Sequence, residues 1–171
     1  MTLSPADDGL LLALLNTTPV VDGRPRDELD SIDAGRRWLT AHGQPASVAE
    51  WKALREVRSV LQDVVRAERD PGGVAPFVAG VGYWATGVDG GITWSLDLPE
   101  GRTAAARAVL AWDALTVSSP GRLRPCANPE CRLFLIDRSK PNSARWCSMA
   151  TCGNRLKARR HYERTRDASQ S

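Results

Sequence analysis

Residues 126–152 read CANPECRLFLIDRSKPNSARWCSMATC and contain all four cysteines of the chain. The pattern is C-x4-C, a gap of fifteen residues and a second C-x4-C. Two close pairs separated by a hairpin-sized gap suit four thiolates that converge on one tetrahedral Zn²⁺. We therefore expect a small module with one structural zinc ion, whose ligands are Cys126, Cys131, Cys147 and Cys152.

Turn signals and short apolar runs divide this module into a knuckle, a hairpin and a helix. The Asn-Pro pair between the first two cysteines marks a tight turn. Residues 132–136 (RLFLI) and 144–146 (ARW) are predicted strands around the turn-rich segment 137–143. A helix is expected from residue 152 to about residue 166, where the helix dipole would favour the thiolate of its first residue. This order is typical of a treble-clef-like finger, in which the metal supplies most of the folding free energy.

Charge divides the chain into an acidic body and a basic end. Residues 1–120 contain 11 Lys/Arg and 16 Asp/Glu, a net charge of −5, whereas residues 121–171 contain 12 Lys/Arg and 4 Asp/Glu, a net charge of +8. A basic segment is attracted to polyanions, so nucleic acid is a candidate partner of the zinc module. Small zinc modules can also be basic without binding nucleic acid.

Most of these cations fall on the predicted C-terminal helix. At about 100° per residue they surround most of its circumference, which suits contact with phosphates, with two or three side chains left to reach base edges. The residues expected to contact nucleic acid are Arg145, Arg155, Lys157, Arg159, Arg160 and Arg164. The alternative is a solvated basic helix, or one that docks on the acidic body of the same chain or on a partner.

The first 117 residues predict a mainly helical domain. Helices are expected over residues 6–16, 28–41 and 102–117, and a longer one from Ser47 to the Asp-Pro-Gly-Gly turn after residue 69. Ser47 with Glu50 three residues later predicts a capping box, in which each side chain satisfies the other's free backbone N–H. The segment 19–27 is a predicted loop, and the Gly-rich residues 72–82 are predicted to be irregular.

The same body contains one hairpin signal and most of the aromatic residues. Residues 83–86 and 92–96 are β-prone runs around Asp89-Gly90-Gly91, a sequence typical of a tight hairpin turn. Five of the six tryptophans lie in this body, at positions 38, 51, 84, 94 and 112. They could line a ligand pocket, but we expect them to form the core, since large aromatics dominate ordinary cores.

Several functional classes find no support in the sequence. The chain has no H-E-x-x-H, G-x-S-x-G or Walker motif, so we expect it not to be an enzyme. Its longest apolar run, residues 10–15, has six residues and no basic flank, far short of the roughly 20 residues of a membrane span. We therefore expect a cytoplasmic protein, in which paired cysteines bind zinc rather than form disulfides.

The module resembles the CGNR zinc finger. The resemblance rests on C-x4-C, RLFLIDRSK and ARWCSMATCGNR, covers residues 123–164, and includes the tetrad Cys152-Gly153-Asn154-Arg155 for which the family is named. In that family the finger usually follows an ABATE domain, which is mainly helical with a small β-hairpin. Residues 6–117 are similar to such a domain through the LLALLNT start, the Trp38–Leu39 helix end and the long helix followed by strands.

The resemblance implies a bacterial transcription regulator. The finger would bind DNA, and the ABATE domain would sense a ligand or stress signal. It also implies that the four cysteines are zinc ligands and that Asn154 and Arg155 are signature residues, with Asn154 able to bond the knuckle or the helix start and Arg155 able to contact phosphate.

We therefore predict an α+β protein, with a mainly helical N-terminal domain that includes a small β-hairpin, followed by a treble-clef-like zinc finger. The expected segments are a sensor domain (1–117), a linker (118–125), the finger (126–166) and a disordered tail (167–171). Double-stranded DNA is the expected partner, together with a small-molecule effector and a second copy of the chain.

Two other functions stay open. One is a protein-interaction adaptor that uses the zinc finger as a docking module on an acidic protein surface. The other is RNA binding, which would require Phe134, Trp146 or Tyr162 to be exposed for stacking on bases.

Overall fold

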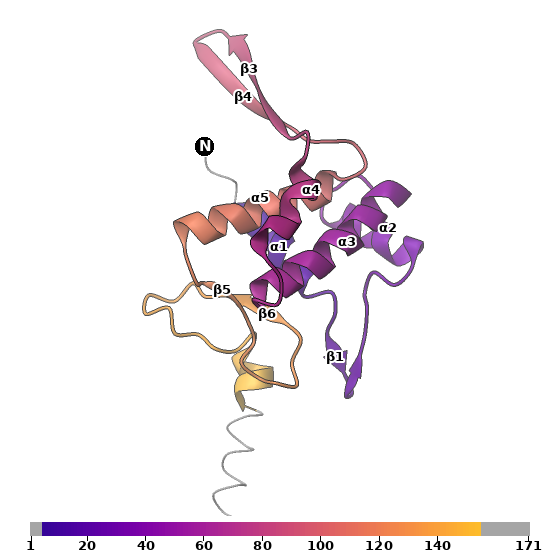
Figure 1. Ribbon diagram of the computed structural model, residues 1–171, viewed down its shortest axis with the longest axis vertical. Coiled ribbons are helices and arrows are strands. Elements are labelled where there is room, and N and C mark those ends of the chain that lie inside the picture. Colours follow the sequence, from indigo (N-terminus) through magenta and orange to yellow (C-terminus); the bar gives the residue numbers. More distant parts are fainter. Residues whose placement is uncertain (1–4, 155–171) are drawn as a thin grey trace, which may run out of the picture.

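Helices make up the centre of the molecule, and three strand pairs lie around it (Figure 1). The structure, a computed structural model, describes residues 5–154. In chain order its elements are α1 (Pro5–Leu15), β1 (Val20–Val21), β2 (Arg24–Pro25), α2 (Ile32–Ala41), α3 (Val48–Val65), η1 (Pro71–Val74), α4 (Ala75–Val78), β3 (Gly82–Val88), β4 (Gly91–Asp97), α5 (Thr103–Ser118), β5 (Leu123–Pro125), β6 (Phe134–Ile136) and η2 (Met149–Gly153). All three strand pairs are antiparallel. The β3–β4 hairpin projects from one end of the molecule, and η2 lies at the other.

The core forms where α1, α3 and α5 pack against one another. Fully buried leucines of α1 and α3 contact a row of fully buried alanines on α5. These alanines are Ala104, Ala105, Ala108 and Ala111. Small side chains let the helices approach closely, and the leucines fill the space between them. The predicted α+β fold, with a mainly helical body, a small hairpin and a cysteine-rich finger, is confirmed.

The predicted helices of the body are confirmed as α1, α2, α3 and α5. The second begins later than the predicted residue 28, because Ser31 caps it by accepting a hydrogen bond from the Ala34 N–H at 3.3 Å. His42 closes the same helix, with its Nδ1 2.8 Å from the carbonyl oxygen of Trp38. Between residues 5 and 154, none of the helices is both long enough and apolar enough to cross a membrane.

Two segments predicted as irregular contain short elements. Residues 19–27 form the β1–β2 hairpin, whose turn places Asp22 and Gly23 at positive φ angles of 51° and 75°. Residues 72–82 contain most of η1, all of α4 and the first residue of β3. The short helix η1 begins where the Asp70 carboxylate accepts a hydrogen bond from the Gly72 N–H at 2.7 Å. The β1–β2 hairpin and η1 both depend on local hydrogen bonds, which hydrophobic periodicity does not reveal.

The predicted capping box is only half formed. Ser47 Oγ accepts a hydrogen bond from the Glu50 N–H at 3.1 Å, as expected. The Glu50 carboxylate, which is 1% exposed, instead caps a different helix. It accepts hydrogen bonds from the N–H groups of Thr103 and Ala104, at 2.7 and 3.1 Å, at the first turn of α5. A helix N-terminus stabilises negative charge, so the buried Glu50 carboxylate on α3 stabilises the N-terminus of α5 and connects the two helices.

A buried arginine ties the chain before α2 to α3. The Arg58 guanidinium donates two hydrogen bonds to the Asp27 carboxylate, at 2.6 and 2.8 Å, and one to Thr17 Oγ1 at 3.0 Å. The hydrogen bonds from Arg58, with a further one from the Leu29 N–H, hold the pKa of the Asp27 carboxyl below its usual value. The ion pair therefore fixes the path of the chain between α1 and α2.

Gly35, in the middle of α2, leaves room for an aromatic ring on α3. A Cβ atom at this position would lie 2.0 Å from Cδ1 of Trp51, a distance that no real contact allows. The indole is held in place because its Nε1 donates a hydrogen bond to the Leu29 carbonyl at 3.0 Å. The glycine therefore serves the packing of α2 against α3 rather than a turn.

We expect Gly35→Ala to destabilise the protein by about 2 kcal/mol, since overpacking typically costs 1–3 kcal/mol. In an exposed helix the same change would stabilise by up to about 1 kcal/mol, so the sign of the effect reports the contact with Trp51. Urea unfolding measures it, with Gly9→Ala as the control, because a Cβ at Gly9 in α1 meets no atom within 4 Å. A stability equal to or above that of the wild type would contradict this packing.

The tryptophans do not all belong to the core. Trp38, Trp51 and Trp112 pack against it, partly buried. Trp84 and Trp94 are 64% and 58% exposed on the projecting hairpin, so the prediction that all five are core residues is wrong. The physical reason is that the β3–β4 hairpin projects away from the helices, so neither of its faces is covered over most of its length.

Candidate metal centre

Two short segments bring the four cysteines together. Cys126 directly follows β5, and its N–H donates to the Leu133 carbonyl at 2.8 Å, which closes the segment between them into a knuckle. The second pair lies on either side of the turn into η2, where the Cys152 N–H donates to the Ser148 carbonyl at 3.0 Å. Backbone hydrogen bonds therefore fix both C-x4-C segments facing one point.

The sulfur atoms form a cluster that fits one zinc ion. All four Sγ atoms lie within 4.8 Å of one another. The Sγ atom of Cys147 lies 3.7 Å from that of Cys131 and 3.7 Å from that of Cys152. Four Zn–S bonds of about 2.3 Å in a tetrahedron place the sulfurs roughly 3.8 Å apart. Cys126, Cys131, Cys147 and Cys152 are thus a ligand set for one structural zinc ion, and soft sulfur donors suit this metal.

Hydrogen bonds to the sulfurs orient two of the ligands. The Asn128 Nδ2 donates to Cys152 Sγ at 3.5 Å, and the Cys147 N–H donates to Cys126 Sγ at 3.5 Å. Such partners stabilise thiolate charge and fix the direction of the lone pairs. Asn128 is 3% exposed, and its Oδ1 also accepts a hydrogen bond from the Glu130 N–H. In the sequence this residue is recognisable only as part of a turn, and no local signal predicts its contact with a ligand.

The protein surroundings alone favour protonated thiols at two of the four positions. Burial raises the pKa of the Cys131 thiol to about 11, and it raises the pKa of Cys147 further, with the neighbouring cysteines adding to that effect. Burial also opposes ionisation of Cys152, but hydrogen bonds from Asn128 and the other cysteines outweigh it and lower the pKa of that thiol. A bound metal needs thiolates, so zinc uptake releases protons and becomes weaker as the pH falls.

Gly153 of the signature tetrad lies where a side chain has little room. It is buried, and a Cβ atom there would lie 2.8 Å from Sδ of Met149 and 3.3 Å from Cδ1 of Trp146. Asn154 is exposed, and its backbone N–H donates to the carbonyls of η2. Within the described part of the chain, the amide side chain that bonds a cysteine is that of Asn128 and not that of Asn154.

The hairpin of the finger pairs differently from the prediction. Within the predicted strand 132–136, residues Phe134–Ile136 form β6, but its partner is β5 and not residues 144–146. The latter segment instead runs beside the knuckle, where the Ala127 N–H donates to the Arg145 carbonyl at 2.8 Å.

A buried carboxylate organises the loop after β6. Asp137, which is 1% exposed, accepts hydrogen bonds from the N–H groups of Ser139 and Ala144, at 2.8 and 2.7 Å. Arg124 contacts the same carboxylate at 3.2 Å and also bonds Asn142. The hydrogen bonds from Ser139 and Ala144, with the charge of Arg124, hold the pKa of the Asp137 carboxyl below its usual value. Arg124 is therefore committed to the loop rather than free to bind a ligand.

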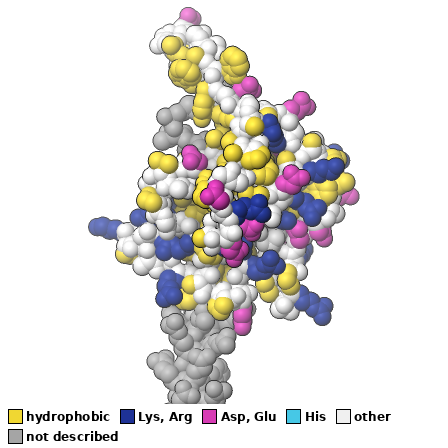
Figure 2. Space-filling view, viewed as in Figure 1, with side chains coloured by type: hydrophobic (Ala, Val, Ile, Leu, Met, Phe, Trp, Pro, Cys, Tyr) yellow, Lys and Arg dark blue, Asp and Glu magenta, His cyan; other side chains and the backbone are white. Residues whose placement is uncertain are grey.

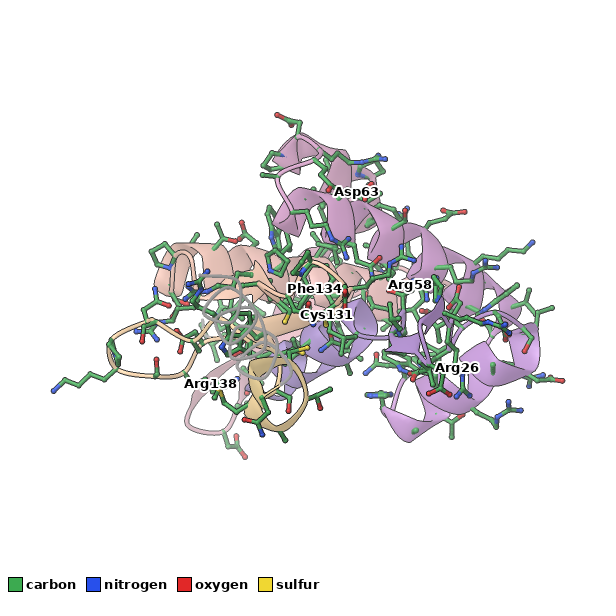
Figure 3. The ribbon with its side chains drawn as sticks, turned by 90° about the horizontal axis from the view of Figure 1, so that it is seen from below. Arg26, Arg58, Asp63, Cys131, Phe134 and Arg138 are labelled. Atoms are coloured by element: carbon green, nitrogen blue, oxygen red, sulfur yellow. The ribbon has the colours of Figure 1, made fainter. Side chains whose placement is uncertain are left out.

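Phe134 joins the finger to the helical body. Its ring is 1% exposed and belongs to the same buried cluster as the leucines of α1 and α3. Its backbone exchanges two hydrogen bonds with the side-chain amide of Asn16, at 2.7 and 3.2 Å, and the Arg66 guanidinium lies 4.5 Å from the ring centroid. Figure 3 shows Phe134 at the middle of the molecule, near Cys131 in that view, with Arg138 toward the edge. The metal centre thus lies directly beside the core of the body.

The segment predicted as a linker is part of this connection. The last turn of α5 reaches Ser118, and residues Leu123–Pro125 form β5, so only the few residues between them connect the two elements. The side chain of Leu123 packs against the main core, and α3 contacts β5. The predicted linker over residues 118–125 is therefore corrected to a short turn followed by the first strand of the finger.

The structure describes one of the six residues predicted to contact nucleic acid. Arg145 is exposed beside the metal centre, and its guanidinium lies 5.6 Å from the ring centroid of Trp146. The other five, Arg155, Lys157, Arg159, Arg160 and Arg164, lie outside the described residues, as do the predicted helix beyond residue 154 and the tail. Exposed cations of the described finger also include Arg138 and Lys140 on the loop after β6.

Comparison with known families agrees with this architecture. Residues 122–165 match the CGNR zinc finger, and residues 8–121 match ABATE, whose description is "Putative stress-induced transcription regulator". No curated protein matches the chain. The ABATE match covers more than half of the chain and ends close to the end of α5, and the CGNR match contains all four cysteines. The chain therefore belongs to the ABATE family and carries a CGNR zinc finger after its ABATE domain.

Proposed function

We propose that this protein is a non-enzymatic transcription regulator that binds double-stranded DNA through its finger, in a reducing cytoplasm. The charge of the finger carries the proposal, since residues 121–171 have a net charge of +8 next to a body of net charge −5. Cations that neutralise phosphates supply most of the non-specific affinity for DNA. The family's description as a transcription regulator supports the same conclusion. Zinc has a structural role, because four protein sulfurs leave it no open position.

The burial of Phe134 favours a duplex over a single strand. Recognition of single-stranded RNA depends on exposed aromatic side chains that stack on bases. Of the three aromatic residues named for RNA binding, Phe134 is 1% exposed, Trp146 is only partly exposed and Tyr162 lies outside the described residues. Arg138, Lys140 and Arg145 are exposed. An adaptor that docks on an acidic protein surface would use the same cations, so the nucleic-acid test below also distinguishes this alternative.

We propose that the ABATE domain responds to a small-molecule effector in a groove beside α5. The groove has a volume of about 730 Å³, within the size range of small-molecule sites. One wall is the outer side of α5, and the other is the loop after β6. Its charged lining includes Asp113 on α5 with Arg138 and Lys140 on the loop, and Arg138 also pairs with Asp8 at 3.3 Å. This mixture of lining side chains suits a ligand that carries both apolar and charged groups.

The first experiment measures binding of the zinc-loaded full-length protein to a pool of genomic duplex fragments over a series of salt concentrations, with sequencing of the retained fragments. A sequence-specific regulator retains an enriched set of fragments at moderate salt. Uniform binding that disappears as salt rises would reveal only a basic surface, and the proposal would then give way to the adaptor function.

Removal of individual finger cations tests where the DNA lies. We expect Arg145→Ala, Arg159→Ala and Arg160→Ala each to weaken binding and to reduce the slope of log K against log salt by about one unit, if each side chain neutralises one phosphate. Arg37→Ala is the matched control, since Arg37 is an exposed arginine on α2 of the acidic body. An unchanged slope in the finger variants would place the DNA elsewhere.

A further inference from the structure

The β3–β4 hairpin has one face that is apolar along its whole length. Residues directly opposite each other in an antiparallel pair point to the same face. From the register, this apolar face consists of Tyr83, Ala85 and Gly87 on β3 and their partners Leu96, Trp94 and Ile92 on β4. The opposite face includes Thr86, Thr93, Ser95 and Asp97 beside Trp84 and Val88. Such alternation is typical of a hairpin with one buried face and one solvated face.

In the single chain this apolar face is largely exposed to solvent. Tyr83, Ile92 and Trp94 are 44%, 66% and 58% exposed. Figure 2 shows hydrophobic side chains gathered over the projecting hairpin, at the end opposite the finger. An isolated two-stranded hairpin is marginally stable in water, so a covering partner would stabilise it. A contiguous exposed apolar surface of this kind marks an interaction site.

Charge restricts what the partner can be. Residues 82–97 contain Asp89 and Asp97 but no Lys or Arg, which disfavours nucleic acid and anionic lipid surfaces. The apolar face itself has no charged side chain, so it offers no ionic contact to a charged peptide. The partner surface must therefore be apolar and uncharged, as this face itself is.

We propose that the partner is a second copy of the chain, packed face to face through the two hairpins. The outer part of the face has a flat row, Ala85 and Gly87, beside a tall row, Trp94 and Ile92. A two-fold axis parallel to the strands lays β4 of each copy over β3 of the other, so that the tall row of one meets the flat row of its partner. An axis across the strands would instead stack tall row on tall row.

The available area suits a dimer of moderate affinity. The partly exposed side chains of the face offer about 400 Å² per protomer, given that a large aromatic buries 150–250 Å². A standard interface buries about 800 Å² per partner. The hairpin face therefore supplies about half of a standard interface, which suits a weak, reversible dimer.

The arrangement also sets the direction of the two fingers. The hairpin projects from the end of the molecule opposite the finger (Figure 1). A two-fold axis along the hairpin therefore leaves both fingers at the same end of the dimer. The dimer does not depend on DNA binding by the finger, so the two proposals can fail separately.

The test is sedimentation velocity of the zinc-loaded full-length protein over a dilution series without DNA. We expect a monomer–dimer equilibrium with a dissociation constant on the order of micromolar.

Trp94→Ser should weaken the dimer by at least about tenfold, as for a central aromatic of an interface. Trp84→Ser is the matched control on the opposite face, and we expect it to change the constant by less than about threefold. Ile92→Thr gives an independent second variant if Trp94→Ser does not fold, as judged by zinc content and thermal unfolding.

Ala85→Trp distinguishes specific packing of the two hairpins from non-specific hydrophobic association. It adds apolar area to the hairpin but fills the flat row, so we expect it to weaken the dimer by at least about tenfold. Stronger association of this variant would overturn the proposal. So would a wild-type chain that stays monomeric up to a few hundred micromolar, or equal effects of Trp84→Ser and Trp94→Ser. If the wild type is monomeric, the partner of the apolar face is a different protein.

Discussion

Cys147→Ser is expected to abolish stoichiometric zinc binding and to unfold the finger together with part of the helical body. Its Sγ atom lies 3.7 Å from two other cysteine sulfurs, so its loss removes one of the four ligands of the cluster. Structural zinc contributes apparent binding free energies of about 10–16 kcal/mol in small modules, more than most domains have in total stability. The body responds as well, because Phe134 of the finger is part of its core.

Zinc content and amide hydrogen exchange together measure this outcome. Exchange should become faster in β5 and β6 and also in α1, whose end bonds Phe134 through Asn16. Ala150→Ser is the matched control, because it introduces the same hydroxyl at an exposed position between two ligands without removing a sulfur. A Cys147→Ser protein that retains one zinc per chain and native exchange rates would show that the cluster is not the metal site.

Phe134→Ala is expected to lower the free energy of unfolding by about 3–5 kcal/mol, the usual cost of truncating a buried aromatic. For a chain of this length that corresponds to a fall of roughly 10 °C in the melting temperature. The ring is not a metal ligand, yet its removal should also weaken zinc binding, because metal binding and body packing stabilise the same β6 strand. Thermal unfolding and competition with a chelator measure the two effects.

Phe134→Leu provides the control for this variant. It retains most of the apolar volume, so we expect a loss of about 1 kcal/mol and a nearly unchanged zinc affinity. If Phe134→Ala leaves the zinc affinity unchanged while the body melts earlier, then the finger and the body are packed together without being coupled energetically.

The sequence predicts the elements whose signal is local. The two C-x4-C pairs identify the metal ligands, because knuckle geometry depends on spacing alone, and the structure brings the four sulfurs within 4.8 Å of one another. The Asp-Gly turn predicts the β3–β4 hairpin, and periodic apolar residues predict the long helices, for the same reason. Ser47 as a helix cap is a further example, since its partner lies three residues away.

The features that the sequence does not predict depend on contacts between distant segments. Glu50 bonds the N-terminus of α5 instead of its own helix, and Asn128 bonds a cysteine 24 residues away. β6 pairs with β5, which lies within the predicted linker, instead of with residues 144–146, and no local signal in residues 118–125 marks that strand. Trp94 is of the residue type that usually fills cores, and it is exposed because the hairpin projects away from the helices.

The position of Phe134 has a consequence for how such chains evolve. The two family matches meet between residues 121 and 122, yet the core of the first contains a side chain from the second. Exchange of the finger for an unrelated one would therefore leave a hole of aromatic size in the helical domain. Recombination at this boundary carries a cost that recombination between independently folded domains does not. We expect the two segments to be inherited as one unit, with residues 16, 66 and 134 varying together.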